Sequence, residues 1–255
     1  MRAVRAEWSK LWSVRSTWVA LGVAVTLTFG LGLADTISTV RGWATMPAAD
    51  RAAFDPLASA FAGLTFAQLA LGVLGVLAVT SEYSSGTIVA ALTAQPRRAV
   101  VFAAKAATVY AVSLLAGEAL AFGSYLLGQA ILHGKHLDVG LGAPGVLRSV
   151  AGAGLYLCVV TMVGLGLGAF LRNPAAATAA LIAVVFLAYG AAKAVEGWSY
   201  LPSRLLLSNA GDVVAQVHAV AAKPRLPSLG LAYLDLALYL AAAVGLGIWR
   251  STRDV

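Results

Sequence analysis

The sequence predicts an all-α polytopic membrane protein with six transmembrane helices, an N-terminal amphipathic interfacial helix and cytoplasmic termini. Hydrophobic residues make up 60% of the 255 residues and charged residues only 11%, whereas soluble domains are roughly 45–50% apolar. Apolar runs close to the ~20 residues needed to cross a bilayer recur along the chain. None of these runs alternates in polarity, which disfavours membrane-spanning strands.

The first 16 residues are expected to form the interfacial helix. In "MRAVRAEWSKLWSVRSTW" one face of a helical wheel carries Val4, Trp8, Leu11 and Trp12, and Lys10 lies opposite with two serines. Tryptophans beside basic side chains are typical of a helix in the headgroup layer. The alternative is a simple flank of the first span, but four large apolar residues on one arc favour the interfacial helix.

Six runs are predicted to span the membrane within a single domain of residues 1–255. They are residues 17–33, 61–80, 106–132, 150–171, 174–192 and 229–249. With six spans both termini share one side. Ten Lys and Arg fall in 51 residues on that side, in segments 1–16, 81–105, 171–174 and 250–255. Only eight fall in 79 residues on the other side, in segments 34–60, 133–148 and 193–228.

This charge bias predicts the orientation of the chain. Lys and Arg are enriched in cytoplasmic loops, so we expect a multi-pass protein of the cell inner or plasma membrane with both termini and residues 81–105 in the cytoplasm. The net charge of +7 then describes membrane orientation. Nucleic-acid binding is disfavoured because no basic domain is available to carry it.

The segment "SEYSSGTIVAALTAQPRRAVVFAAK", residues 81–105, is a polar and basic island between apolar runs. Gly86 interrupts the preceding helix, and Thr87 suits the N-cap of a new one. Ile88 and Leu92 share one face of that short helix, and Pro96 ends it. A plain connector needs only a few residues, so we expect a partner to hold this helix.

The same segment resembles the permease subunits of ABC-2 type ABC transporters. The family's E-[FY]-x-x-G-T-[IL] and P-R-R-x-x-x-x-x-K pattern is met by Glu82, Tyr83, Gly86, Thr87, Pro96, Arg97, Arg98 and Lys105. The interfacial helix and the six-span layout extend the resemblance over the chain, although its specific part covers about 25 residues. The resemblance implies a coupling loop that docks on a separate ATPase through Glu82, Tyr83, Gly86, Thr87, Ile88, Leu92, Pro96, Arg97 and Arg98.

The resemblance also implies the partners of the chain. The protein partners are a second permease copy, in a homodimer, and two copies of an ABC ATPase subunit. The ATPase uses ATP and Mg²⁺. Membrane lipid surrounds the permease. This chain is expected to bind no cofactor and to be no enzyme, because it contains no G-x-x-x-x-G-K-[ST] motif. The nearest stretch, "GQAILHGKH", has one residue too many and ends in His136. Gly164 and Gly168 form a small-residue pair suited to close helix packing.

Acidic residues inside spans mark candidate sites, because a charge near the bilayer centre costs roughly 2.5–3.5 kcal/mol on insertion scales. Glu118 either shapes a substrate path with Tyr125 and Gln129 or makes a structural hydrogen bond. Asp235 is expected to be structural, and Lys193 is a candidate ion-pair partner for either acid.

A metal site is not expected. His133, His136 and Asp138 lie close together in the sequence, but two histidines in a polar loop without a further ligand cluster usually bind nothing.

Residues 195–228 are too polar for a seventh span, since Arg204, Asp212 and His218 interrupt their apolar residues. We expect an outer re-entrant segment, with an ordered interfacial loop as the alternative.

Three function classes remain, and the permease of an ABC exporter is favoured. A secondary transporter would predict internal repeats and broken helices around central charges. A membrane scaffold or sensor would not need the bracketed cytoplasmic helix. The sequence does not define a substrate.

Overall fold

The computed structural model describes residues 2–84, 98–195, 204–216 and 227–253, and the regular structure in these residues is helical throughout. Five helices are long and apolar enough to cross a membrane. They are α2 (Arg15–Gly42), α5 (Leu64–Ser84), α7 (Arg98–His133), α8 (Val146–Leu171) and α13 (Leu229–Thr252). The structure therefore confirms the all-α fold, and its five long apolar helices are consistent with a multi-pass membrane protein.

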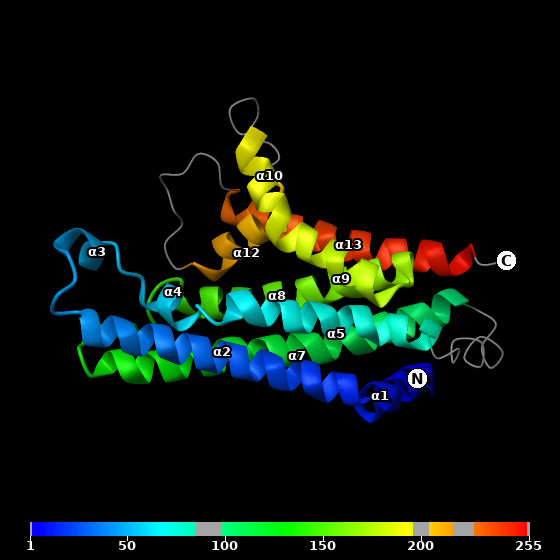
Figure 1. The fold of residues 1–255 in the computed structure, drawn as a ribbon, viewed down its shortest axis with the longest axis horizontal. Coiled ribbons are helices and arrows are strands. Elements are labelled where there is room, and N and C mark those ends of the chain that lie inside the picture. Colours follow the sequence, from blue (N-terminus) through cyan, green and yellow to red (C-terminus); the bar gives the residue numbers. More distant parts are fainter. Residues whose placement is uncertain (1, 85–97, 196–203, 217–226, 254–255) are drawn as a thin grey trace.

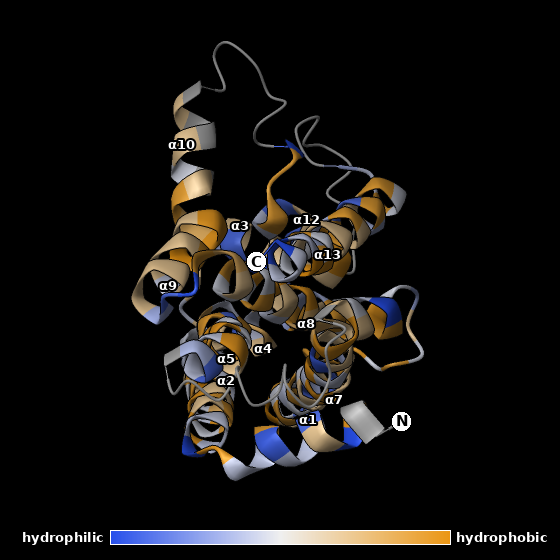
Figure 2. Cartoon of the chain, turned by 90° about the vertical axis from the view of Figure 1, so that its right-hand side faces the viewer, coloured by the Kyte–Doolittle hydropathy of each residue, from blue (hydrophilic) through white to orange (hydrophobic). Residues whose placement is uncertain are grey.

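Helix α1 (Arg2–Ser13) crosses one end of the bundle and packs against α7 and α2 (Figure 2). Leu11 is buried, while Val4 and Trp8 next to it on the same apolar arc are 43% and 42% exposed. The Trp12 ring lies between those of Trp8 and Trp18, edge-to-face with Trp8 at 5.7 Å between ring centroids and tilted against Trp18 at 5.0 Å. An amphipathic helix whose apolar arc is only partly covered by the bundle is the form expected at an interface.

Helix α8 is the central element, since it packs against α5, α7 and α13. Of the residues in its most apolar 18-residue stretch, 72% are buried. Close approach to α5 depends on two glycines. A Cβ at Gly168 would lie 2.9 Å from the carbonyl oxygen of Val76, and one at Gly164 would collide with the backbone of Gly72. The small-residue pair that the sequence predicted to allow close packing thus works inside this chain, between α8 and α5.

The predicted fifth span, residues 174–192, is a succession of three helical pieces. They are α9 (Pro174–Ile182), the π-helical η1 (Ala183–Leu187) and α10 (Ala188–Val195). Asn173 caps α9, its Oδ1 accepting a hydrogen bond from the Ala176 amide at 3.0 Å. Figure 1 shows α10 leaving the bundle at a steep angle to α9. Only 174–187 qualifies as a shorter apolar helix, so a sixth span stays a prediction.

Two short helices, α3 (Ala48–Ala52) and α4 (Pro56–Ala60), connect α2 to α5. Asp55 caps α4 by accepting a hydrogen bond from the Leu57 amide at 2.9 Å. At the other end of α4, the carbonyl of Ala60 accepts a hydrogen bond from Ser124 of α7 at 2.6 Å. This connection is therefore fastened to the bundle.

Helix α12 (Leu207–Ala215) falls within the segment predicted to be re-entrant. It packs against α8 and α13 and buries Leu207 and Val214. Arg148 of α8 donates hydrogen bonds to the carbonyls of Val214 at 3.3 Å and Gln216 at 2.6 Å. These bonds satisfy carbonyls that a helix C-terminus otherwise leaves unpaired. The relation of α12 to a membrane stays a prediction.

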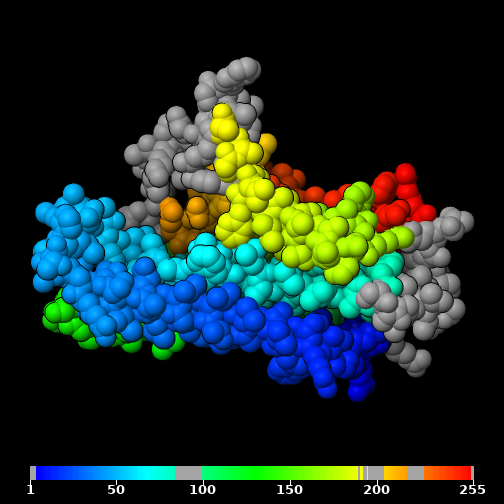
Figure 3. All heavy atoms as spheres, in the orientation of Figure 1, coloured from blue at the N-terminus to red at the C-terminus, as the bar shows by residue number. Residues whose placement is uncertain are grey.

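The long helices run side by side, so the molecule has two distinct ends (Figure 1). Both ends of the described chain, the end of α5 and the start of α7 lie at one end, and α3 lies at the other. Figure 3 shows α2, α5 and α9 exposed next to one another along one face.

Candidate functional site

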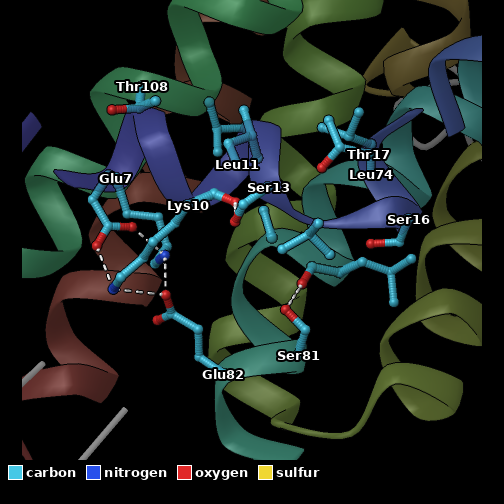
Figure 4. Close-up of a pocket in the computed structure, with 15 residues that line it drawn as sticks. Glu7, Lys10, Leu11, Ser13, Ser16, Thr17, Leu74, Ser81, Glu82 and Thr108 are labelled. Carbon is cyan, nitrogen blue, oxygen red and sulfur yellow. Dashed lines mark hydrogen bonds and ion pairs between the residues drawn. The ribbon is translucent and has the colours of Figure 1, made fainter. Parts of the chain in front are cut away.

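Four charged side chains from three helices meet at the end of the bundle that α1 crosses (Figure 4). Glu7 and Lys10 come from α1, Glu82 from the last turn of α5, and Lys105 from α7. Lys10 Nζ lies 2.9 Å from Glu7 Oε1 and 3.1 Å from Glu82 Oε1. Lys105 Nζ pairs with Glu7 Oε2 and lies 2.9 Å from Glu82 Oε1. We call these four residues the ion cluster.

The ion cluster is largely buried. Glu7, Glu82 and Lys105 are 6%, 7% and 5% exposed, whereas the Lys10 side chain is 42% exposed. Two positive and two negative groups alternate, so the cluster is neutral as a whole. Burial without partners would cost several kcal/mol per ion, and the reciprocal pairing offsets that penalty.

Two groups of the ion cluster belong to α1, outside the predicted spans. Burial acts to raise the pKa of Glu7, but the charges and hydrogen bonds of Lys105 and Lys10 outweigh it and lower that pKa. Burial acts to lower the pKa of Lys10, and its bonds to Glu7 and Glu82 raise it instead. Both shifts show that the cluster favours the charged forms.

The local sequence explains how these residues come together. Glu7 and Lys10 are three positions apart on α1 and therefore share a face. Lys105 follows the start of α7 at Arg98 by seven residues, about two helical turns. Glu82 and Lys105 thus stand on the two helices that enter and leave segment 85–97, and both are bound to α1.

The end of α5 is held on a second side by α8. The guanidinium carbon of Arg172 lies 5.0 Å from the ring centroid of Tyr83, a cation–π contact. Arg172 follows α8 in the left-handed conformation, with φ 54°, and its amide donates to the Gly168 carbonyl at 2.9 Å. Neighbouring residues of α5 therefore connect to α1, α7 and α8.

A pocket of about 380 Å³ adjoins the ion cluster between α1, α2, α5 and α7. Glu7, Lys10 and Glu82 lie together at one end of it (Figure 4), and Lys105, which pairs with Glu7 and Glu82, also lines it. Figure 4 shows hydroxyl and aliphatic side chains around the rest, among them Ser13, Thr17, Leu11 and Leu74. The pocket therefore offers charged, hydroxyl and apolar surface to one occupant.

The predicted coupling residues have different outcomes. Glu82 and Lys105 point into the ion cluster, and Tyr83 contacts Arg172. Arg98 is described only as the first residue of α7. The others lie outside the described residues, so their part in coupling stays a prediction; they are Gly86, Thr87, Ile88, Leu92, Pro96 and Arg97.

The candidate path residues Tyr125 and Gln129 hold the loop that follows α7. The Tyr125 hydroxyl donates to the Val139 carbonyl at 2.6 Å, and Gln129 Oε1 accepts from the Val139 amide at 2.8 Å. Both residues therefore have a structural role at the end of the bundle opposite α1, and a path role stays a prediction.

Glu118 packs against α8 at a close helix crossing. A Cβ on Gly154 would lie 2.6 Å from Glu118 Cδ. Glu118 Oε2 is buried and has no hydrogen-bond partner in the part of the chain that the structure describes. Asp235 is also buried. Lys193 was the predicted ion-pair partner of either acid. Its side chain lies outside the described residues, so this pairing stays a prediction.

His133 Nδ1 lies at hydrogen-bond distance from Asp138 Oδ2, 3.0 Å away, and the histidine side chain is 74% exposed. Among the described residues no group of three or more His, Cys, Asp or Glu side chains is placed to hold a metal ion.

Sequence reasoning missed Glu7, the acid that joins α1 to α7. Its signal is an acidic residue on a helix otherwise rich in tryptophan and basic residues, three positions before a lysine.

Comparison with protein-family models and with curated proteins finds no match to this chain.

Proposed function

We propose that the chain is the permease subunit of an ABC-2 type ABC exporter and works with a separate ATPase subunit. The observation that carries the proposal is the ion cluster, which joins the two helices flanking segment 85–97 to each other and to α1. A force applied to this segment by a partner would be passed to α1, α5 and α7 together.

The arrangement of the bundle supports the same proposal. Both described termini and both flanks of segment 85–97 lie at one end (Figure 1), as expected if these parts face the cytoplasm. Residues 174–195 form the fifth of the six spans in this proposal, since they are helical without a break. Two permease copies with two ATPase copies would then complete the exporter, with ATP and Mg²⁺ bound by the ATPase.

The test is capture of the ATPase by the permease. The tagged chain is coexpressed with a candidate ABC ATPase subunit from the same genome, and the complex is purified and tested for ATP hydrolysis and vesicle transport. Replacing Ile88 and Leu92 by Asp is expected to abolish capture, because two carboxylates would be forced into an apolar groove.

The matched control places the same charges at the opposite end of the molecule. Ala48 and Ala52 are exposed on α3 and are also four residues apart. Replacing both by Asp should leave capture and transport unchanged. The proposal is wrong if the Ile88 and Leu92 variant captures the ATPase and transports as the parent does.

A further inference from the structure

The pocket beside the ion cluster has the lining of a lipid site. Its apolar wall includes Leu74, Leu77 and Val109. Leu74 precedes Glu82 by eight residues on α5, about 12 Å along the helix. The apolar wall therefore extends from the charged end toward the middle of the bundle, as a lipid chain extends from its headgroup.

The hydroxyl groups of the pocket present acceptors to an occupant. Ser13 Oγ donates its proton to the Lys10 carbonyl at 2.8 Å, and Thr108 Oγ1 donates to the Ala104 carbonyl at 2.9 Å. A hydroxyl has one donor and two acceptor lone pairs, so these oxygens can only accept from a ligand.

Glu82 is a second and independent reason to expect that the occupant of the pocket carries a hydrogen-bond donor. The residue lines the pocket and is 7% exposed, and its Oε2 is buried without a hydrogen-bond partner in the described part of the chain. A buried carboxylate oxygen left without a donor is costly. An ammonium group in the pocket supplies that donor once the Glu82 carboxyl turns to present this oxygen to the pocket.

The charges of the pocket select a zwitterion over an anion. Two lysines and two glutamates line it, so an anionic headgroup would face two carboxylates. Lys10 is 42% exposed at its side chain and has a third ammonium proton for a phosphate beyond its two carboxylate contacts. Ammonium and phosphate on one headgroup match this arrangement.

We propose that this pocket binds a membrane lipid with a phosphoethanolamine headgroup. The ammonium bonds to Glu82 and the hydroxyl oxygens, the phosphate lies near Lys10, and one acyl chain follows Leu74 and Leu77. The volume of about 380 Å³ lies within the roughly 300–1,000 Å³ of small-molecule sites. The proposal does not rest on a transport function.

Native mass spectrometry of the purified full chain tests the proposal. The protein is given equimolar dioleoyl phosphatidylethanolamine and dioleoyl phosphatidylcholine, which share acyl chains and phosphate. Phosphatidylcholine has no N–H donor, so we expect about a tenfold preference for phosphatidylethanolamine. Equal retention of the two lipids by the unaltered chain would overturn the proposal. In a second equimolar mixture, of dioleoyl phosphatidylethanolamine and dioleoyl phosphatidylglycerol, a preference for the anionic lipid would also overturn it.

Two further experiments test where the lipid binds and whether binding requires its acyl chains. Ala78→Phe fills the pocket from α5 and should remove the preference, whereas Ala107→Phe on the exposed face of α7 should keep it. Preference that survives Ala78→Phe places the lipid elsewhere. Glycerophosphoethanolamine, the headgroup without chains, should not compete at the same concentration, and competition by it would refute a lipid site.

Discussion

Replacing Lys105 by Met removes the buried cation of the ion cluster while nearly keeping the length of the side chain. Glu7 and Glu82, both less than 10% exposed, would retain only Lys10 as a partner. Removing one member of a buried ion pair costs about 3–5 kcal/mol, because a buried charge is left uncompensated. Lys10→Met should cost about 1 kcal/mol or less, since that side chain is 42% exposed and its pairs are screened by solvent.

Thermal unfolding of the detergent-purified chain measures the difference. At about 2–4 °C per kcal/mol for a chain of this size, Lys105→Met should lower the Tm by about 6–20 °C. Lys10→Met should lower it by no more than about 4 °C. Hydrogen exchange of residues 2–13 should speed up in Lys105→Met, because α1 loses its link to α7.

A double replacement separates charge from packing. Adding Glu7→Gln to Lys105→Met removes one stranded carboxylate, so part of the lost Tm should return. If Lys105→Met melts within about 2 °C of the parent, or if Lys10→Met is equally damaging, the ion cluster does not hold α1 as argued.

Stability of α1 should depend on pH in both directions. The lowered pKa of Glu7 adds stability that is complete above its ordinary value of 4.5 and is lost as pH falls through the pKa of the folded protein. The raised pKa of Lys10 adds stability that is complete below 10.5 and is lost as pH rises through its folded value. Protection factors of residues 2–13 should therefore be highest between these limits, and a flat profile would contradict the pairing. Arg148→Met removes two hydrogen bonds from a charged donor to the end of α12 and should cost about 1.5–3 kcal/mol. Exchange should then speed up in residues 207–215 but not in 2–13, and uniform speeding would argue against a local anchor.

The apolar runs predicted the long helices but not their ends. The first run was predicted over 17–33, and α2 continues to Gly42. Polar residues do not stop a helix by themselves, and Asp35 finds a partner in Ser59, whose Oγ donates to its Oδ2 at 2.7 Å. The break between α1 and α2 at Val14, with φ −92° and ψ 126°, has no Pro or Gly to mark it. It is set by the docking of α1 across the bundle.

The sequence pattern identified two members of the ion cluster but did not predict that their side chains point into this chain. Glu82 and Lys105 were predicted as parts of a loop motif, and Glu82 was expected to contact a partner. Their side chains are buried within the chain. Glu7 could not be paired from the sequence because it lies 98 positions from Lys105. Only the fold brings positions so distant into contact.

Because Glu7 and Lys105 are 98 positions apart, the ion cluster can be completed only late in the synthesis of these helices. Translation at about 5–20 residues per second delivers Lys105 on the order of 5–20 s after Glu7. Until then Glu7 has only Lys10 beside it, and α1 lacks its neighbour on α7. The N-terminal helix is thus made first, but its buried link to α7 forms only after the helix that carries Lys105 has been made. This link can exist only when α1 and α7 have come together.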